Sequence, residues 1–282
     1  MKPISVNELT ESVNSNLPRE IKSTIAKNIL AEEKDPESAR EIFYRLINDL
    51  TTKAQKEVIN ATGTVLHTNL GRSPNNIAFP GRYTNIEYDL TNLARGNRNE
   101  YLSLLMNDLI GSQDIAFVNN NASSLYLSLK AISKSHNIRN VIISRGEIIE
   151  IGGSYRLPEI ISETDLSLIE IGTTNKTKLS DYTKALESYP DSLILKVHRS
   201  NFSINGFTED VSIAELAELK NNFDVLLLHD LGSGLVVDKK FLEINNVSIF
   251  KNEPFVQDSL SDGADLVMFS GDKLFGSVQS GM

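Results

Sequence analysis

The spacing of hydrophobic residues along this 282-residue chain changes at about residue 55. Before that point, apolar residues recur every three or four positions, which is typical of amphipathic helices. One such helix is predicted after Pro36, with apolar positions 39, 42, 43, 46, 47 and 50, and another after Pro18, with apolar positions 21, 25, 29 and 30. We therefore expect residues 1–55 to form a small domain of two or three helices.

From Val58 onward, short apolar runs alternate with helical patterns. The runs predict strands at 115–118, 141–143, 168–171, 193–197, 225–229 and 266–269. The helical patterns predict helices at 99–110, 122–133, 179–188 and 213–221. Strands that alternate with helices at this spacing form βαβ units. Residues 56–282 are therefore expected to form one α/β domain with a mostly parallel sheet and flanking helices.

Composition excludes several classes of protein. With 40% hydrophobic and 23% charged residues, no long apolar stretch and no apolar core of a secretory signal, the sequence indicates a soluble, cytoplasmic protein without a membrane span. The absence of cysteine excludes disulfides, thiolate metal sites and cysteine nucleophiles, and four histidines do not favour a metal centre. The net charge of −9 gives no overall attraction to nucleic acid, which would have to bind a local basic patch.

Lys273 is the first candidate for chemistry, because it follows the apolar run 265–269 after a short turn that begins at Ser270. Open α/β sheets bind ligands at the carboxyl ends of their strands, and lysine forms Schiff bases with pyridoxal phosphate (PLP). Asp230 ends the apolar run 225–229, and a carboxylate there would keep the pyridinium nitrogen of PLP protonated. By its local sequence alone, Lys273 also fits an ordinary exposed lysine of a loop.

A turn of Asn119, Asn120 and Asn121 leads into the helix predicted from Ala122. Backbone N–H groups at a helix N-terminus can hold an anion such as the phosphate of a cofactor. Asn and Ser residues at such a place are also common helix caps, and the sequence leaves both interpretations open.

The segment that ends at Arg72 mixes Asn, Thr, His and Arg with apolar residues over positions 59–72. A purely structural loop would leave several polar groups buried, each of them costly unless it is paired. Arg72 has the planar, bidentate donor set that suits a phosphate-like anion. We therefore interpret this segment as part of a binding site.

A series of segments, in the same order along the chain, resembles the hallmark segments of the bacterial L-seryl-tRNA(Sec) selenium transferases, or selenocysteine synthases. They are INATGTVLHTNLGR at 59–72, EYDL at 87–90, RGNR at 95–98, NNN at 119–121, SRGE at 144–147, EIGG at 150–153, GTTN at 172–175, DLGSG at 230–234 and SGDK at 270–273. The first run is specific, and the resemblance covers nearly the whole chain.

This resemblance implies a PLP enzyme of fold type I, with Lys273 as the Schiff-base lysine and Asp230 as the partner of the pyridinium nitrogen. Arg72 matches a catalytic, anion-binding arginine of a site that a neighbouring subunit of a dimer completes. The remaining residues assigned to cofactor binding are Asn120, Asn121, Ala122 and Ser270.

The family converts seryl-tRNA(Sec) to selenocysteinyl-tRNA(Sec) with selenophosphate, through an aminoacrylyl intermediate on PLP. It recognises the tRNA with an N-terminal helical domain and assembles as a ring of dimers. The resemblance implies the same substrates, the same tRNA-binding role for residues 1–55, and a homo-oligomer.

Several positions depart from the family pattern, and they leave two alternatives open. Residues 274–281 replace a glycine- and proline-containing turn, and the other departures are Ala94, Arg199, Phe202 and His229. The chain also ends at Met282, whereas the family continues with a portion that covers one side of the crevice, so that a C-terminally truncated chain is expected. The alternatives are a related PLP lyase acting on a small amino acid or amino sugar acid, and an inactive truncated remnant.

Overall fold

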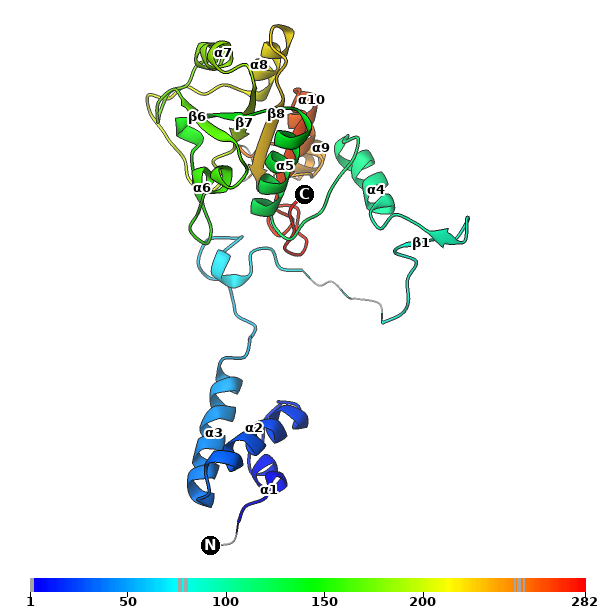
Figure 1. The fold of residues 1–282 in the computed structure, drawn as a ribbon, viewed down its shortest axis with the longest axis vertical. Coiled ribbons are helices and arrows are strands. Elements are labelled where there is room, and N and C mark those ends of the chain that lie inside the picture. Colours follow the sequence, from blue (N-terminus) through cyan, green and yellow to red (C-terminus); the bar gives the residue numbers. More distant parts are fainter. Residues whose placement is uncertain (1–2, 76–77, 79–80, 246, 248–249, 251) are drawn as a thin grey trace. The chain divides into compact units, whose positions relative to one another are not determined.

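The computed structural model describes residues 3–75, 78, 81–245, 247, 250 and 252–282. The chain divides into two compact units, Met1–Ala61 and Thr62–Met282, and each is described by itself (Figure 1). No helix in the described parts of the chain is long and apolar enough to cross a lipid bilayer.

The first unit consists of three helices, α1 (Val6–Glu11), α2 (Arg19–Glu32) and α3 (Pro36–Thr52). Asp35 caps α3 by accepting a hydrogen bond from the Ser38 N–H, and Pro36 takes the first helical position, where its missing N–H is no loss. The apolar faces meet in one core made of Leu9, Ala26, Ile29, Ala39, Phe43 and Ile47.

A five-stranded parallel sheet forms the centre of the second unit, in the order β6-β3-β7-β8-β9. Its strands are β3 (Asn140–Ser144), β6 (Ser167–Ile171), β7 (Ser192–Val197), β8 (Leu227–Gly232) and β9 (Leu266–Phe269). Helices cover both faces of the sheet, which is why these strands read as nearly continuous apolar runs in the sequence. The predicted α/β class with a mostly parallel sheet behind an N-terminal helical module is confirmed.

The two faces of the sheet have separate cores, because successive strand residues point to opposite sides. Val141 and Ile143 pack with α5 (Asn121–Ser135) and α6 (Leu157–Ser162), whereas Ile142 packs with α7 (Leu179–Ser188) and α8 (Ile213–Glu218) (Figure 1). A further apolar cluster joins α4 (Glu100–Ile110) and α10 (Val256–Ser261) to β9, and α9 (Lys239–Ile244) precedes α10 along the chain.

The predicted strand at 115–118 is wrong. The backbone of this segment forms a single antiparallel bridge, between Val118 and Gly281, and no longer ladder. A strand needs a neighbour along its length, and the apolar run of 115–118 has only this one contact. The predicted helix 213–221 is also divided, into α8 and the 3₁₀ turn η3 (Leu219–Asn221).

The structure also contains short elements that the sequence analysis did not predict. Two small antiparallel hairpins pair β1 (Tyr88–Asp89) with β2 (Ala94–Arg95) and β4 (Glu150–Ile151) with β5 (Tyr155–Arg156). Two 3₁₀ turns, η1 (Thr68–Leu70) and η2 (Arg145–Glu147), lie in the segments that end at Arg72 and follow β3. Strands of two residues are too short to show an alternating pattern, and so periodicity could not reveal them.

Candidate active site

A cavity of about 670 Å³ lies where β7, β8 and β9 end and α5 begins. The carboxyl ends of parallel strands are the usual place for ligands in an open α/β sheet. The structure brings every predicted site residue to the wall of this cavity, namely Arg72, Asn120, Asn121, Ala122, Asp230, Ser270 and Lys273.

Asp230 is buried on β8, and its Oδ1 accepts hydrogen bonds from Asn121 Nδ2 at 2.8 Å and from the Gly232 N–H at 3.0 Å. Burial raises the pKa of Asp230, although both hydrogen bonds and the positive charge of Lys273 act in the opposite direction. A cation beside this carboxylate would therefore stabilise its ionised form. Asn121 Oδ1 is itself buried and has no hydrogen-bond partner among the described residues.

Lys273 lies in the turn after β9, and the Leu274 N–H anchors this turn by donating to the Ser233 carbonyl at 3.0 Å. Burial lowers the pKa of Lys273, and the positive charge of Arg72 lowers it further, against the opposing effect of Asp230. A lysine with a lowered pKa is neutral more often, which makes its amine a better nucleophile.

Arg72 is held beside Lys273 by an ion pair with Asp272, whose two carboxylate oxygens lie 3.1 and 3.2 Å from Arg72 NH1. The backbone supports this pair, because the Ser73 N–H donates to the Asp272 carbonyl at 3.0 Å. Arg72 has a φ of 62°, in the left-handed region that is uncommon for residues other than glycine. The guanidinium group therefore reaches the cavity of its own chain through a backbone conformation that costs free energy.

The beginning of α5 confirms one of the two interpretations of the asparagine turn and leaves the other as a prediction. Asn120 is a helix cap, because its side chain accepts a hydrogen bond from the Ser123 N–H at 2.9 Å. The first N–H groups of a helix have no acceptor within the helix, and the residues that carry them, Asn121 and Ala122, line the cavity. Capping by the Asn120 side chain thus leaves these N–H groups for an anion.

His198 lines the cavity and is not among the site residues predicted from the sequence. Its N–H donates to the Asp230 carbonyl at 2.8 Å, and its Nε2 lies 3.2 Å from Glu253 Oε2. Glu253 also accepts a hydrogen bond from Ser233 Oγ at 3.0 Å. The sequence contained a signal for this residue. His198 directly follows the apolar run of β7, just as Asp230 follows the apolar run 225–229.

Other arginines of the segments named above do not line the cavity. Arg95 and Arg98 are exposed and pair with Glu87 next to the β1–β2 hairpin. Arg145 pairs with Glu170 at the surface. These residues stabilise local structure, and they add no positive charge to the site.

Comparison with known proteins gives the family. The sequence profile described as "SelA: L-seryl-tRNA selenium transferase" matches residues 58–282. The L-seryl-tRNA(Sec) selenium transferase of Moorella thermoacetica is 44% identical over 265 residues, which cover 91% of this chain and 54% of that protein. The one of Mannheimia succiniciproducens is 40% identical over 291 residues, which cover 98% and 60%. The chain thus spans a little over half the length of these curated relatives.

Among solved structures, D-glucosaminate-6-phosphate ammonia-lyase matches with a TM-score of 0.50 and 16% sequence identity, over 64% of this chain and 46% of that chain. At this identity the likeness concerns the fold alone, and it agrees with the fold-type-I class predicted above. The profile match and the sequence identities show that the chain belongs to the L-seryl-tRNA(Sec) selenium transferase family.

Proposed function

We propose that this site binds PLP through Lys273 and converts seryl-tRNA(Sec) to selenocysteinyl-tRNA(Sec), with selenophosphate as the selenium donor. The observation that carries the proposal is the meeting of three groups in one cavity: the Lys273 amine, the buried Asp230 carboxylate and the start of α5. The chain's membership in the family supports this choice of substrates.

The residues around the cavity fit each part of PLP. The start of α5 offers N–H donors for the phosphate, and Lys273 offers an amine of lowered pKa for the aldehyde. Asp230 is a buried carboxylate that lacks a full counter-charge, and a protonated pyridine nitrogen would supply one. Asn121 Oδ1 adds a buried acceptor that has no partner in the described part of the chain, which also indicates a ligand at this place.

PLP, when bound, supplies an electron sink that stabilises a carbanion at the α-carbon of the amino acid. Lys273 is the group in this cavity that can take up the α-proton, because its lowered pKa keeps a fraction of its amine neutral. Asp230, whose carboxylate is held by the Asn121 hydrogen bond, would stay ionised beside the protonated ring nitrogen of PLP. Arg72 uses NH1 for Asp272 and has further guanidinium donors with which to bind the phosphate of the selenium donor.

The remaining parts of the proposal concern partners. The helical domain at residues 1–55 recognises the tRNA, and the chain assembles as a homo-oligomer, a ring of dimers. Support comes from the family alone, since the relatives are named for seryl-tRNA(Sec).

Replacement of the anchor lysine tests the proposed cofactor site. The chain incubated with PLP is expected to show a visible absorbance band, and borohydride reduction should fix the cofactor to the peptide that contains Lys273. Lys273→Ala should abolish both signals, whereas the exposed Lys184→Ala should leave them unchanged. A modified lysine elsewhere, or an unmodified Lys273 in protein saturated with PLP, would contradict the proposal.

A binding experiment with tRNA separates the proposed transferase from a small-molecule lyase. PLP-loaded protein should retain seryl-tRNA(Sec) on a filter more strongly than seryl-tRNA of an ordinary serine acceptor. Cofactor loading without any tRNA binding would favour the lyase, and folded protein without cofactor loading would favour an inactive remnant.

A further inference from the structure

The neighbouring strands β3 and β7 separate toward their carboxyl ends. The ladder between β3 and β7 contains the pairs 140–192, 141–193 and 142–194 and then ends. Both strands continue on their outer sides, where Ser144 pairs with Ile171 and Val197 pairs with Asp230. The last residues of β3 and β7 therefore have no backbone partner across the gap between them, at the point where the strand order reverses.

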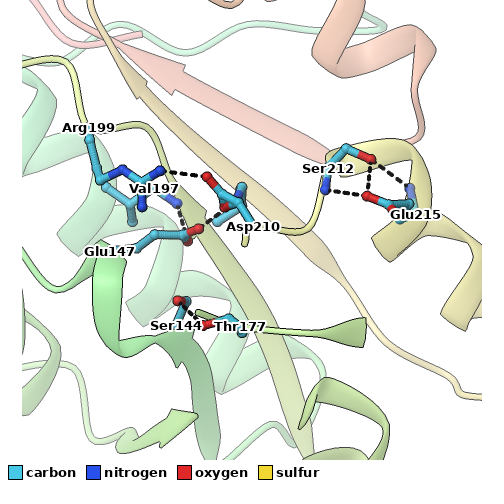
Figure 2. A network of polar contacts seen from close by, with 9 residues as sticks. Ser144, Glu147, Thr177, Val197, Arg199, Asp210, Ser212 and Glu215 are labelled. Carbon is cyan, nitrogen blue, oxygen red and sulfur yellow. Dashed lines mark hydrogen bonds and ion pairs between the residues drawn. The ribbon is translucent and has the colours of Figure 1, made fainter. Parts of the chain in front are cut away.

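Glu147 closes this gap. It is almost completely buried, and its Oε2 accepts a hydrogen bond from the Val197 N–H at 3.0 Å (Figure 2). A side-chain carboxylate from the turn after β3 thus takes the place of the strand carbonyl that would continue the ladder. The sequence predicts no such contact, since 50 residues separate its two partners.

A network of alternating charges holds the Glu147 carboxylate. Its Oε1 lies 2.5 Å from Lys196 Nζ, which also lies 3.2 Å from Asp210 Oδ1. Asp210 Oδ2 in turn contacts Arg199 NH2 at 2.5 Å (Figure 2). Burial raises the pKa of Glu147, and the charge of Lys196 opposes this effect. A buried carboxylate is costly without a partner, and the ion pair with Lys196 therefore allows Glu147 to remain buried and charged.

The turn that carries Glu147 is packed too closely to move freely. A Cβ atom at Gly146 would lie 2.6 Å from the Thr174 carbonyl oxygen. Ser144 Oγ and Thr177 Oγ1 are buried and hydrogen-bonded to each other at 2.7 Å (Figure 2). The SRGE and GTTN segments therefore pack against each other and fix the position of the Glu147 backbone.

The backbone that Glu147 holds, at Val197, forms part of the cavity wall. Val197 lies opposite Asp230 in the β7–β8 ladder, and the next residue, His198, donates its N–H to the Asp230 carbonyl at 2.8 Å. Val197 and His198 both line the cavity, while Glu147 and Lys196 do not. Glu147 is thus connected to the cavity wall through its hydrogen bond with the Val197 N–H.

We propose that Glu147 is a positioning residue, which sets the place of His198 and Asp230 in the cavity by closing the gap between β3 and β7. Its effect on PLP rests on the proposed function, because that function makes Asp230 the partner of the cofactor. Its effect on the backbone of β7 does not depend on PLP.

Amide hydrogen exchange and PLP titration test this proposal together. In Glu147→Ala, the Val197 and His198 amides should exchange about tenfold faster, and the PLP dissociation constant should rise by about the same factor. In Glu147→Gln combined with Lys196→Met, both values should return toward wild type, since a glutamine oxygen still accepts the Val197 N–H and no lysine is left unpaired. Glu170→Gln, which removes the neighbouring surface pair with Arg145, is the matched control and should change neither value.

Unchanged exchange at Val197 and His198 in a folded Glu147→Ala variant would overturn the proposal, and so would an unchanged PLP dissociation constant. If this variant does not fold, two double variants are compared instead by their affinity for PLP. Both contain Lys196→Met, one together with Glu147→Gln and the other together with Glu147→Leu. Only the leucine version lacks the acceptor, so only it should bind PLP weakly; equal affinities would overturn the proposal. Wild-type protein that binds no PLP would contradict the proposed function, and the exchange data alone would then decide the role of Glu147.

Discussion

At the scale of single residues, burial and the charges around Lys273 together set the pKa of its amine. Arg72 and Asp272, which precedes Lys273 directly, form an ion pair. The positive charge of Arg72 and the negative charge of Asp272 therefore act on Lys273 in opposite directions. Burial and Arg72 together lower the pKa of Lys273, and the carboxylates of Asp230 and Asp272 raise it by less. The surroundings of Lys273 therefore favour its neutral amine.

Removal of the Arg72 charge should raise the pKa of Lys273. In Arg72→Met, one positive charge disappears and Asp272 loses its partner, so that both changes favour the protonated lysine. The acetylation rate of Lys273, followed against pH by mass spectrometry of its peptide, should show a midpoint at higher pH than in wild type. Arg98→Met, which removes an exposed arginine paired with Glu87, is the control and should leave the midpoint in place. A midpoint that stays or falls in Arg72→Met would contradict this explanation.

At the scale of elements, the last residues of the chain hold the start of α5. Gly281 pairs with Val118 on one side and with Ser270 on the other. A Cβ atom at Gly281 would lie 2.2 Å from the Asn120 carbonyl oxygen and 2.4 Å from Ser124 Oγ. Glycine is required here by the close approach of two backbones.

Gly281→Ala should therefore destabilise the protein and weaken PLP binding in the same variant. The added methyl group forces the first turn of α5 and the 280–282 segment apart, at a cost of about 1–3 kcal/mol in the free energy of unfolding. Urea unfolding and PLP titration measure the two effects. Gly81→Ala is the control, since a Cβ atom there meets no described residue within 4 Å. Equal unfolding free energies of Gly281→Ala and wild type would contradict the argument.

The same elements show how much the sequence could predict. β3, β7 and β8 were predictable because both of their faces are buried and each contains a short apolar run, at 141–143, 193–195 and 227–228. The segment 115–118 is just as apolar, but its pairing depends on Gly281, which no local pattern reveals. Lys273 was predictable as a cavity residue because it follows the last strand, and Asp230 because it ends the apolar run 225–229, although β8 continues through it to Gly232. The Arg72–Asp272 pair was not, because 200 residues separate its partners.

At the scale of the whole molecule, the folded state carries a histidine that cannot be protonated near neutral pH. His229 is buried on β8, its Nδ1 lies 3.0 Å from Ser259 Oγ, and burial lowers its pKa to about 3. In the unfolded chain the same group titrates near its ordinary pKa of about 6.5. The unfolded state therefore binds one proton more than the folded state between these two values.

This difference predicts a loss of stability in acid. Because the unfolded state binds the extra proton, His229 lowers the free energy of unfolding as the pH falls from about 6.5 to about 3, by up to about 1.4 kcal/mol per pH unit. His229→Asn should lose less stability than wild type between pH values of about 6.5 and 4.5, as measured by urea unfolding at each pH. Other groups contribute equally to both proteins and cancel in the comparison. Parallel pH profiles would show that His229 does not titrate in this way.

Asn121 links two ends of the cavity. This residue opens α5, and its amide donates to Asp230 on β8, so that one side chain joins the proposed phosphate end of the site to the proposed ring-nitrogen end. The position of this one residue therefore sets the distance that a bound pyridine phosphate must span between its ring nitrogen and its phosphate. A homologue of PLP with one more methylene between ring and phosphate could not keep both its contact with the start of α5 and its contact with Asp230. The site should therefore discriminate between ligands by their length.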